Sequence, residues 1–240
     1  MATLFISDLH LEPGRPEIGE QFLSFLEGPA READALYILG DVFEAWIGDD
    51  DPSPYYAQMK TAIRAVTDSG VPVYFMHGNR DFMIGGAFAA EAGVTLLNDP
   101  HPLELHGESV LLSHGDALCT DDIEYQKVRA MTRNPDWQAM MMAKSVEERI
   151  AFAKQAREQS LARNESMTEE IADVNQAAVE QTIQESGVDV LLHGHTHRPA
   201  VHPFHVDERP VHRIVLGDWY DQGSMVIWDE DGPRLEELPR

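Results

Sequence analysis

Short apolar runs separated by polar turns recur along the chain. They predict strands at 3–6, 35–39, 71–76, 109–112, 188–192, 213–216 and 224–228. The apolarity of these runs is nearly continuous rather than alternating, which is typical of sheets covered on both faces. Patterns of helical period at 18–26, 55–69 and 86–92 predict helices between the early strands. The chain is therefore expected to be a layered α/β protein whose late strands run antiparallel.

One long segment lacks this alternation of predicted strands and helices. Residues 121–187 are rich in Ala, Glu, Gln, Met, Lys and Arg, which are good helix formers, and show no strand pattern. We expect 121–167 to be a helical insertion over the active site, interrupted at Pro135, and 1–120 with 168–240 to form the α/β core. Thr168, followed by Glu169 and Glu170, predicts an N-cap that starts the last helix of the segment.

Candidate chemistry lies where the predicted strands end. Five strands are each followed by Asp, Asn or His beside a glycine: Asp8-Leu9-His10, Gly40-Asp41, Gly78-Asn79-Arg80-Asp81, His114-Gly115-Asp116 and Gly194-His195-Thr196-His197. Ligands of open α/β sheets bind at the carboxyl ends of strands, so we expect these blocks to meet at one sheet edge. A single block of this kind is more often a turn or a cap, whereas five in succession favour a site.

The side chains in these blocks form a mixed oxygen and nitrogen ligand set without a thiolate. The candidate metal ligands are Asp8, His10, Asp41, Asn79, His114, His195 and His197. Such a set suits Mn, Fe, Co or Zn. Seven ligands are too many for one catalytic ion with an open position, and they suit two ions that together hydrolyse phosphate esters or anhydrides.

These five blocks, in this order, resemble the calcineurin-like metallophosphoesterase family. The resemblance implies a four-layer αββα sandwich with two metal positions. It assigns Asp8, His10, Asp41 and His197 to one ion and Asp41, Asn79, His114 and His195 to the other, with Asp41 as the bridge.

One position departs from the family pattern. Most members have histidine after the Gly-Asn pair, where this chain has Arg80. Arginine cannot act as a general acid, but it can clamp phosphate oxygens and stabilise charge in the transition state. The substitution favours a bond whose leaving group departs without a proton, and hence a pyrophosphate over a phosphodiester.

Longer stretches around the same blocks, 6–11, 39–50, 76–82, 112–122 and 193–199, are similar to a group of pyrophosphohydrolases from Gram-negative bacteria, and the similarity runs over nearly the whole chain. This resemblance implies hydrolysis of UDP-2,3-diacylglucosamine to UMP and 2,3-diacylglucosamine 1-phosphate (lipid X) in lipid A biosynthesis. It implies two Mn²⁺ ions, favoured over Fe, Co or Zn, and a metal-activated water that attacks the α-phosphorus.

The resemblance also implies roles for individual residues. The catalytic residues would be His10, Asn79, Arg80 and His195. The substrate contacts would be Asn79, Arg80, Asp122, Ser160, Asn164 and His195. Met167 stands where the family more often has a lysine, and Arg157 and Arg163 are the candidates to replace that contact.

The insertion has apolar side chains suited to two acyl chains, because each buried methylene group contributes about 0.8 kcal/mol. They are Met131, Trp137, Met140, Met141, Met142, Ile150 and Phe152. Packing of the insertion onto the core is the alternative explanation for these residues. The eight cations of the insertion could contact an anionic lipid surface, although a solvated helical face explains them nearly as well.

Composition excludes several other functions. The chain has 18 Lys and Arg against 42 Asp and Glu, a net charge of −24, which opposes binding to nucleic acid. The insertion is neutral, so the excess acidity belongs to the core.

One cysteine, Cys119, excludes an internal disulfide and suggests a reducing cytoplasm. The N-terminal residues do not resemble a signal peptide, and no apolar run is long enough to span a bilayer. We expect a cytoplasmic protein in peripheral contact with the inner membrane, without an obligate protein partner.

Two alternatives remain open. The first is an enzyme of the same fold with another substrate, such as a nucleotide pyrophosphatase or a cyclic-nucleotide phosphodiesterase; Arg80 and the methionine-rich insertion argue against it. The second is a scaffold that keeps the fold and has lost the chemistry, which the complete set of seven ligand positions opposes.

Overall fold

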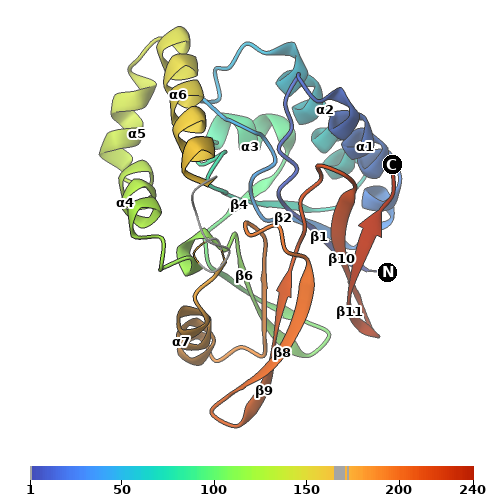
Figure 1. The fold of residues 1–240 in the computed structure, drawn as a ribbon. Coiled ribbons are helices and arrows are strands. Elements are labelled where there is room, and N and C mark those ends of the chain that lie inside the picture. The colour runs from blue at the N-terminus through green and yellow to red at the C-terminus, as the bar shows by residue number, and fades with distance from the viewer. Residues whose placement is uncertain (1, 165–170, 172) are drawn as a thin grey trace.

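Two β-sheets stack face to face at the centre of the computed structural model, which describes residues 2–164, 171 and 173–240 (Figure 1). The six-stranded sheet has the order β11-β10-β1-β2-β3-β4. Its strands are β1 (Thr3–Ile6), β2 (Ala35–Ile38), β3 (Val73–Met76), β4 (Thr95–Leu97), β10 (Gly223–Asp229) and β11 (Gly232–Leu238). The first four run parallel, and β10 pairs antiparallel with β1.

The five-stranded sheet has the order β5-β6-β7-β9-β8. It consists of β5 (His101–Leu105), β6 (Glu108–Ser113), β7 (Val190–His193), β8 (Ala200–Val206) and β9 (Arg209–Val215). The three inner strands β6, β7 and β9 run parallel, and the edge strands β5 and β8 pair antiparallel with their neighbours. The expectation of antiparallel late strands therefore holds for β10 and is wrong for β9, which pairs in parallel with β7.

The helices form the outer layers and the insertion. The bounds are α1 (Pro16–Glu27), α2 (Pro54–Asp68), α3 (Gly86–Ala92), α4 (Ile123–Thr132), α5 (Pro135–Met142), α6 (Val146–Asn164) and α7 (Gln176–Ser186), with short 3-10 helices at Pro29–Glu32 and Asp116–Leu118. In Figure 1, α4, α5 and α6 form a group of their own on the left, apart from α1 and α2 on the right.

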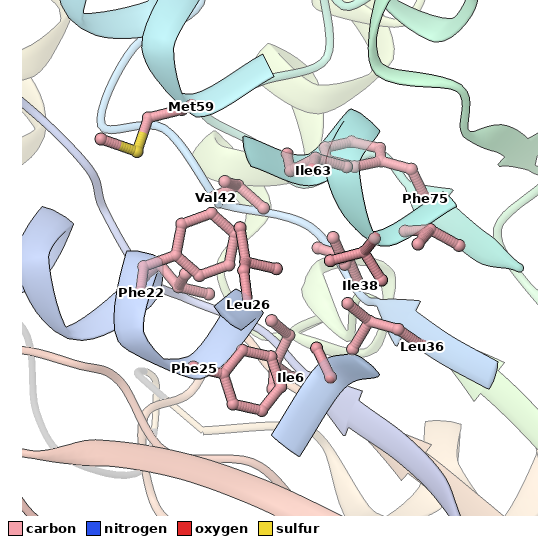
Figure 2. Close-up of a cluster of buried hydrophobic side chains, with 14 of the residues drawn as sticks. Ile6, Phe22, Phe25, Leu26, Leu36, Ile38, Val42, Met59, Ile63 and Phe75 are labelled. Carbon is pink, nitrogen blue, oxygen red and sulfur yellow. The ribbon is translucent and has the colours of Figure 1, made fainter. Parts of the chain in front are cut away.

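Buried strands send alternate side chains into two different cores, which is why their sequences look continuously apolar. In β1, Leu4 and Ile6 face the core beneath α1 and α2, whereas Phe5 faces the space between the sheets. Figure 2 shows the first of these cores, where Phe22 of α1 and Ile63 of α2 lie against the strands. A third core packs α7 against the outer face of the five-stranded sheet. The three cores separate four layers, so the predicted αββα sandwich is confirmed.

Thr168, the predicted helix start, lies outside the described residues, and the helix expected to continue from it is absent from the described residues that follow. Ile171 and residues 173–175 are not helical, and α7 begins only at Gln176. Asn175 is its N-cap, since its side-chain oxygen accepts a hydrogen bond from the Ala178 amide. The Asn175 amide group also donates to Asp121, and these bonds place the cap beside the start of the insertion.

Candidate metal centre

Loops from both sheets supply the predicted ligands. Asp8, Asp41 and Asn79 follow β1, β2 and β3 of one sheet, whereas His114 and His195 follow β6 and β7 of the other. The expectation of a single sheet edge is therefore wrong. The carboxyl ends of parallel strands in two stacked sheets meet instead, because the sheets face each other across a shared core.

Hydrogen bonds hold the loops together within and across the sheets. The Asp8 amide donates to the Gly40 carbonyl at 3.0 Å, within the first sheet. The His195 amide donates to Asp8 Oδ2 at 2.9 Å, which joins the two sheets. Asp81 accepts from the Gly78 and Val42 amides at 2.7 and 2.8 Å and so braces the loops after β2 and β3.

Five of the candidate ligands have a backbone conformation that is uncommon for residues other than glycine. Asp8, His10, Asp41, His195 and His197 all have φ between 53° and 69°. Such conformations cost free energy and persist only where the surroundings enforce them, and they concentrate at functional sites. The loops are therefore shaped to direct these side chains, at some expense in stability.

Two glycines allow the carboxylates to approach the opposite loop. A Cβ atom on Gly78 would lie 2.1 Å from Asp41 Oδ1, and one on Gly194 would lie 2.2 Å from Asp8 Oδ2. Any side chain at these positions would displace a candidate ligand.

The first cluster contains Asp8, His10 and His197, whose possible ligand atoms lie within 4.8 Å of one another. The Nε2 atoms of the two histidines are 3.2 Å apart, and His197 Nε2 is 3.4 Å from Asp8 Oδ1. Ser7 and the His195 amide donate to the other oxygen of Asp8, while Asp8 Oδ1 is buried and accepts no hydrogen bond from the described residues. A buried carboxylate oxygen without a donor, facing two imidazole nitrogens, fits a divalent cation.

The second cluster contains Asp41, His114 and His195, again with ligand atoms within 4.8 Å of one another. His114 Nε2 lies 3.8 Å from Asp41 Oδ1 and 3.0 Å from Asn79 Oδ1. The structure thus brings all seven predicted ligands together, six in the two clusters and Asn79 beside the second.

The acidic groups of the site change the protonation of its histidines. Burial opposes the charge on His197, but the nearby carboxylates of Asp218 and Asp8 raise its pKa to about 10. Burial likewise opposes the charge on His114, and the nearby carboxylates of Asp41 and Asp8 raise its pKa to about 9. Without a cation, protons compensate the carboxylates; a metal ion would take over that role and release them.

Second carboxylates hold the outer nitrogens of the histidines in the first cluster. His10 Nδ1 donates to Glu44 Oε2 at 2.9 Å, and Asp218 Oδ2 lies 3.3 Å from His197 Nδ1. His114 Nδ1 in the second cluster instead donates to the Leu39 carbonyl at 2.8 Å. Glu44 and Asp218 are not among the site residues predicted from the sequence. Gly217-Asp218 follows β9 as Gly40-Asp41 follows β2, and this signal could have indicated Asp218.

A cavity of about 840 Å³ lies between the metal-centre loops and the insertion. Among its lining residues are five of the predicted substrate contacts: Asn79, Arg80, Asp122, Arg157 and Ser160. His195 does not itself line the cavity. Its ring lies beside that of Tyr125, which does, with 5.7 Å between the ring centroids. The Arg163 and Asn164 side chains and the whole of Met167 lie outside what the structure describes.

Apolar side chains form much of the remaining cavity wall. The insertion contributes Val128, Met131, Trp137, Met141, Ile150 and Phe152, and the core contributes Trp46, Ile47, Phe82 and Met83. Met140 and Met142, also predicted for an apolar trough, do not line it; both are more than 40% exposed.

Ion pairs attach the insertion to the acidic core. Arg129 of α4 and Arg133, which directly follows this helix, lie 3.0 and 3.5 Å from buried Asp116, which also accepts a hydrogen bond from Tyr125. The buried Arg149 of α6 donates to Asp50 and to the Ile47 carbonyl. Further along α6, Arg157 pairs with Glu44. These four cations face protein carboxylates and not solvent alone.

The helices described here do not include one that is both long and apolar enough to cross a bilayer.

Comparison with known proteins identifies the class of this protein. A family model described as calcineurin-like phosphoesterase matches residues 1–199. The chain is 53% identical over 247 residues to a "UDP-2,3-diacylglucosamine hydrolase" of Stenotrophomonas maltophilia (strain R551-3), with all of both chains covered. A protein of the same name from Xanthomonas axonopodis pv. citri (strain 306) is also 53% identical, with 99% of each chain covered.

Similar solved structures include an archaeal phosphodiesterase, at 15% identity and a TM-score of 0.47, covering 99% of this chain and 100% of the other. Vacuolar protein sorting 29 from Cryptosporidium parvum aligns with 14% identity and a TM-score of 0.47 over 100% of this chain and 98% of its own. The family match and the close relatives together show that the chain belongs to the calcineurin-like phosphoesterase family.

Proposed function

We propose that this protein hydrolyses the pyrophosphate bond of UDP-2,3-diacylglucosamine, releasing UMP and 2,3-diacylglucosamine 1-phosphate, as a step of lipid A biosynthesis. The observation that carries the proposal is the position of Asn79 and Arg80. They follow the strand that bears part of the candidate metal centre, and they line the same cavity as the apolar side chains of the insertion. The name of the relatives that are 53% identical over full length supports the same substrate.

Two divalent cations, for which we propose Mn²⁺, would be held by the clusters Asp8-His10-His197 and Asp41-His114-His195, with Asn79 beside the second and Asp41 shared between them. When bound, such ions activate water for attack and neutralise phosphate charge. Hard carboxylate oxygens and imidazole nitrogens without sulfur fit Mn²⁺.

The residues around the clusters would bind and orient the pyrophosphate. Arg80 lines the cavity, and its Nε is buried without a hydrogen-bond acceptor among the described residues. Its backbone is fixed, because the Arg80 amide donates to Asp41 and its carbonyl accepts from Trp46. A guanidinium held in this way can bind phosphate oxygens and stabilise the charge that develops on them. We assign Asn79 and His195 to the same task, and His10 to holding the first cation.

The remaining contacts belong to the insertion. We propose that Asp122, Arg157 and Ser160 contact the sugar or its phosphates, since each lines the cavity. Asn164, at the end of α6, and Met167 complete the proposed set.

The segment 121–167 would cover the active site and hold the acyl chains. The large apolar side chains that line the cavity, among them Trp46, Met131 and Phe152, suit hydrocarbon better than a second nucleotide. Aromatic side chains of core and insertion meet there, with 6.0 Å between the ring centroids of Phe82 and Trp137.

We further propose peripheral contact with the cytoplasmic face of the inner membrane. Apolar side chains of the insertion that are at least 39% exposed include Ile123, Val128, Met131, Met140, Met142, Ile150 and Phe152. Because four insertion arginines pair with core carboxylates, apolar rather than cationic contacts would dominate the attachment.

Product analysis tests the proposed reaction. Purified protein with Mn²⁺ should release UMP from UDP-2,3-diacylglucosamine, and a chelator should stop the release. In ¹⁸O-labelled water, the label should enter UMP, because attack is at the α-phosphorus. Label in the sugar 1-phosphate would contradict the proposed direction of attack. Faster turnover of a cyclic nucleotide would favour the phosphodiesterase alternative, and full activity in chelator would contradict metal dependence.

A further inference from the structure

Glu44 joins two parts of the molecule that are distant in sequence. It follows β2, and its amide donates to the Leu11 carbonyl at 3.1 Å, which fixes its backbone beside the loop of the first metal cluster. Its side chain is 14% exposed. Oε2 accepts from His10 Nδ1 at 2.9 Å, and Oε1 lies 2.5 Å from Nε of Arg157 on α6. One carboxylate therefore contacts a metal-centre histidine and an insertion helix.

We propose that Glu44 is a positioning residue that couples occupancy of the first metal cluster to the order of helix α6, through His10 on one side and Arg157 on the other. The inference rests on the proposed metal-dependent function and adds a connection between its two parts.

The contact with His10 sets which imidazole nitrogen can bind a cation. A carboxylate only accepts, so His10 Nδ1 carries the proton and Nε2 is left free. Nε2 is the atom that faces the cluster, 3.2 Å from Nε2 of His197. Tyr220 stacks on the other side of the ring, with 5.2 Å between centroids, so the ring is held in this orientation. Such outer carboxylates orient the ligand and increase its basicity.

The contact with Arg157 connects cation binding at His10 to the insertion helix α6. A cation at His10 Nε2 polarises the ring and strengthens the bond from Nδ1 to Glu44. A better ordered Glu44 carboxylate presents a fixed partner to Arg157, and ordering of Arg157 restrains α6. Because coupling between two equilibria is reciprocal, restraint of α6 also favours the metal-bound state.

Asp218 provides the matched comparison. It lies 3.3 Å from His197 Nδ1 and so supports the other histidine of the same cluster. Asp218 contacts His197 and the Tyr220 amide, both in the core. Asp218 should therefore affect metal affinity without affecting α6.

The test uses the full chain and Mn²⁺ alone, without substrate. Calorimetry measures Mn²⁺ affinity, and hydrogen exchange measures protection of the α6 amides in saturating Mn²⁺ against chelator. In the wild type, Mn²⁺ should slow exchange in α6. Glu44→Gln should weaken Mn²⁺ binding by about 10–100-fold and abolish the protection. Asp218→Asn should weaken binding to a similar extent and keep the protection at saturation.

Arg157→Met separates the two contacts of Glu44, since it removes only the outer one. It should bind Mn²⁺ more weakly than the wild type but more tightly than Glu44→Gln, and it should lose the protection of α6. The inference is overturned if Glu44→Gln binds Mn²⁺ as tightly as the wild type, or if Arg157→Met keeps the protection. Should Glu44→Gln fail to fold, as judged by circular dichroism, Arg157→Met alone decides.

A wild type that binds no Mn²⁺ would contradict the proposed metal centre itself, whereas a wild type that binds Mn²⁺ without any change in α6 would contradict only the coupling.

Discussion

The metal-centre loops and the insertion are built by opposite means. In the loops, four of the seven candidate ligands are buried, five have left-handed backbone conformations, and backbone hydrogen bonds tie the loops together. The insertion presents exposed apolar side chains and is attached to the core by a few ion pairs, such as Arg149 with Asp50.

The difference follows from what each region is proposed to bind. Two cations need ligands fixed to within a fraction of an ångström, which a rigid double sheet supplies. Acyl chains need apolar volume that adapts in shape, which flexible methionine side chains and helices with few fixed contacts supply. Substitutions in the loops should therefore affect chemistry for every substrate, and substitutions in the insertion should affect only the substrate with acyl chains.

The largest effect is expected at the shared carboxylate. Asp41→Asn removes the negative charge proposed to lie between the two cations. Loss of a residue that only supports a metal ligand already lowers activity by up to about 100-fold, so UMP release should fall by more than about 100-fold when the ligand itself is changed. The thermal midpoint in chelator should change little, since the amide oxygen can still accept from the Arg80 amide. Asp68→Asn, at the exposed end of α2, is the control. Equal loss of activity and stability would assign Asp41 a structural role.

Gly78→Ala tests the close packing of the loops. The added Cβ would lie 2.1 Å from Asp41 Oδ1, so the loop after β3 must move. We expect a loss of about 1–3 kcal/mol in the free energy of unfolding, measured by urea denaturation, together with weaker Mn²⁺ binding. At Gly86 the same substitution meets no atom within 4 Å and should be neutral. A stable Gly78→Ala protein with normal metal affinity would mean that the loops are more adaptable than described.

Phe152→Ala tests the apolar wall of the insertion. Phe152 lines the cavity and contacts Trp137, with 5.7 Å between ring centroids. Its loss should lower kcat/KM for the diacyl substrate by about tenfold, in line with about 1–3 kcal/mol for a small change in an apolar pocket. Turnover of a UDP-sugar without long acyl chains should be unchanged.

Met140→Ala is the control for this substitution, because Met140 is exposed on the same insertion and does not line the cavity. Equal effects of Phe152→Ala on both substrates would mean that Phe152 supports the packing of the insertion and does not bind the acyl chains.

The smallest effect is expected on stability, from loss of the ion pair between Arg149 of the insertion and Asp50 of the core. The hydrogen bond from Arg149 lowers the pKa of Asp50 below its ordinary 3.8. A carboxylate with a depressed pKa stabilises the fold above its unfolded pKa, and this contribution is lost as pH falls through the lower, folded value. Asp50→Asn should therefore reduce stability at pH 7 by less than about 1 kcal/mol, since Asp50 is 54% exposed. The difference from wild type, measured by urea denaturation, should shrink below pH 3.8. A difference that does not shrink as the pH falls below 3.8 would contradict an ionic attachment.

The sequence predicted the inner part of the fold and missed its edges. All seven predicted strands are inner strands, and the four that were not predicted, β4, β5, β8 and β11, are the edges of the two sheets. Inner strands are buried on both faces, so they appear as apolar runs; edge strands such as β5 alternate in exposure and tolerate Pro102. Edge strands are thus less visible to a search for apolar runs.

The candidate site was predictable for a similar reason. Its ligands follow inner strands beside glycine, a pattern visible along the chain, whereas their meeting across two sheets depends on tertiary stacking. Glu44 and Asp218 contact histidines and do not stand at the predicted ligand positions. Asp218 shares the Gly-Asp pattern of the ligand blocks, whereas Glu44 has no such signal. The cap at Asn175 depends on Asp121, which is distant in sequence, and local pattern favoured Thr168 instead.

The most direct test of the account is whether the metal centre and the insertion act on one substrate. We would measure kcat/KM with Mn²⁺ for UDP-2,3-diacylglucosamine and for UDP-N-acetylglucosamine, which keeps the pyrophosphate and lacks the two long acyl chains. The account predicts that the diacyl substrate is cleaved to UMP at least about 100-fold more efficiently, corresponding to about 2.7 kcal/mol from the apolar cavity. Equal efficiency for the two substrates would contradict it.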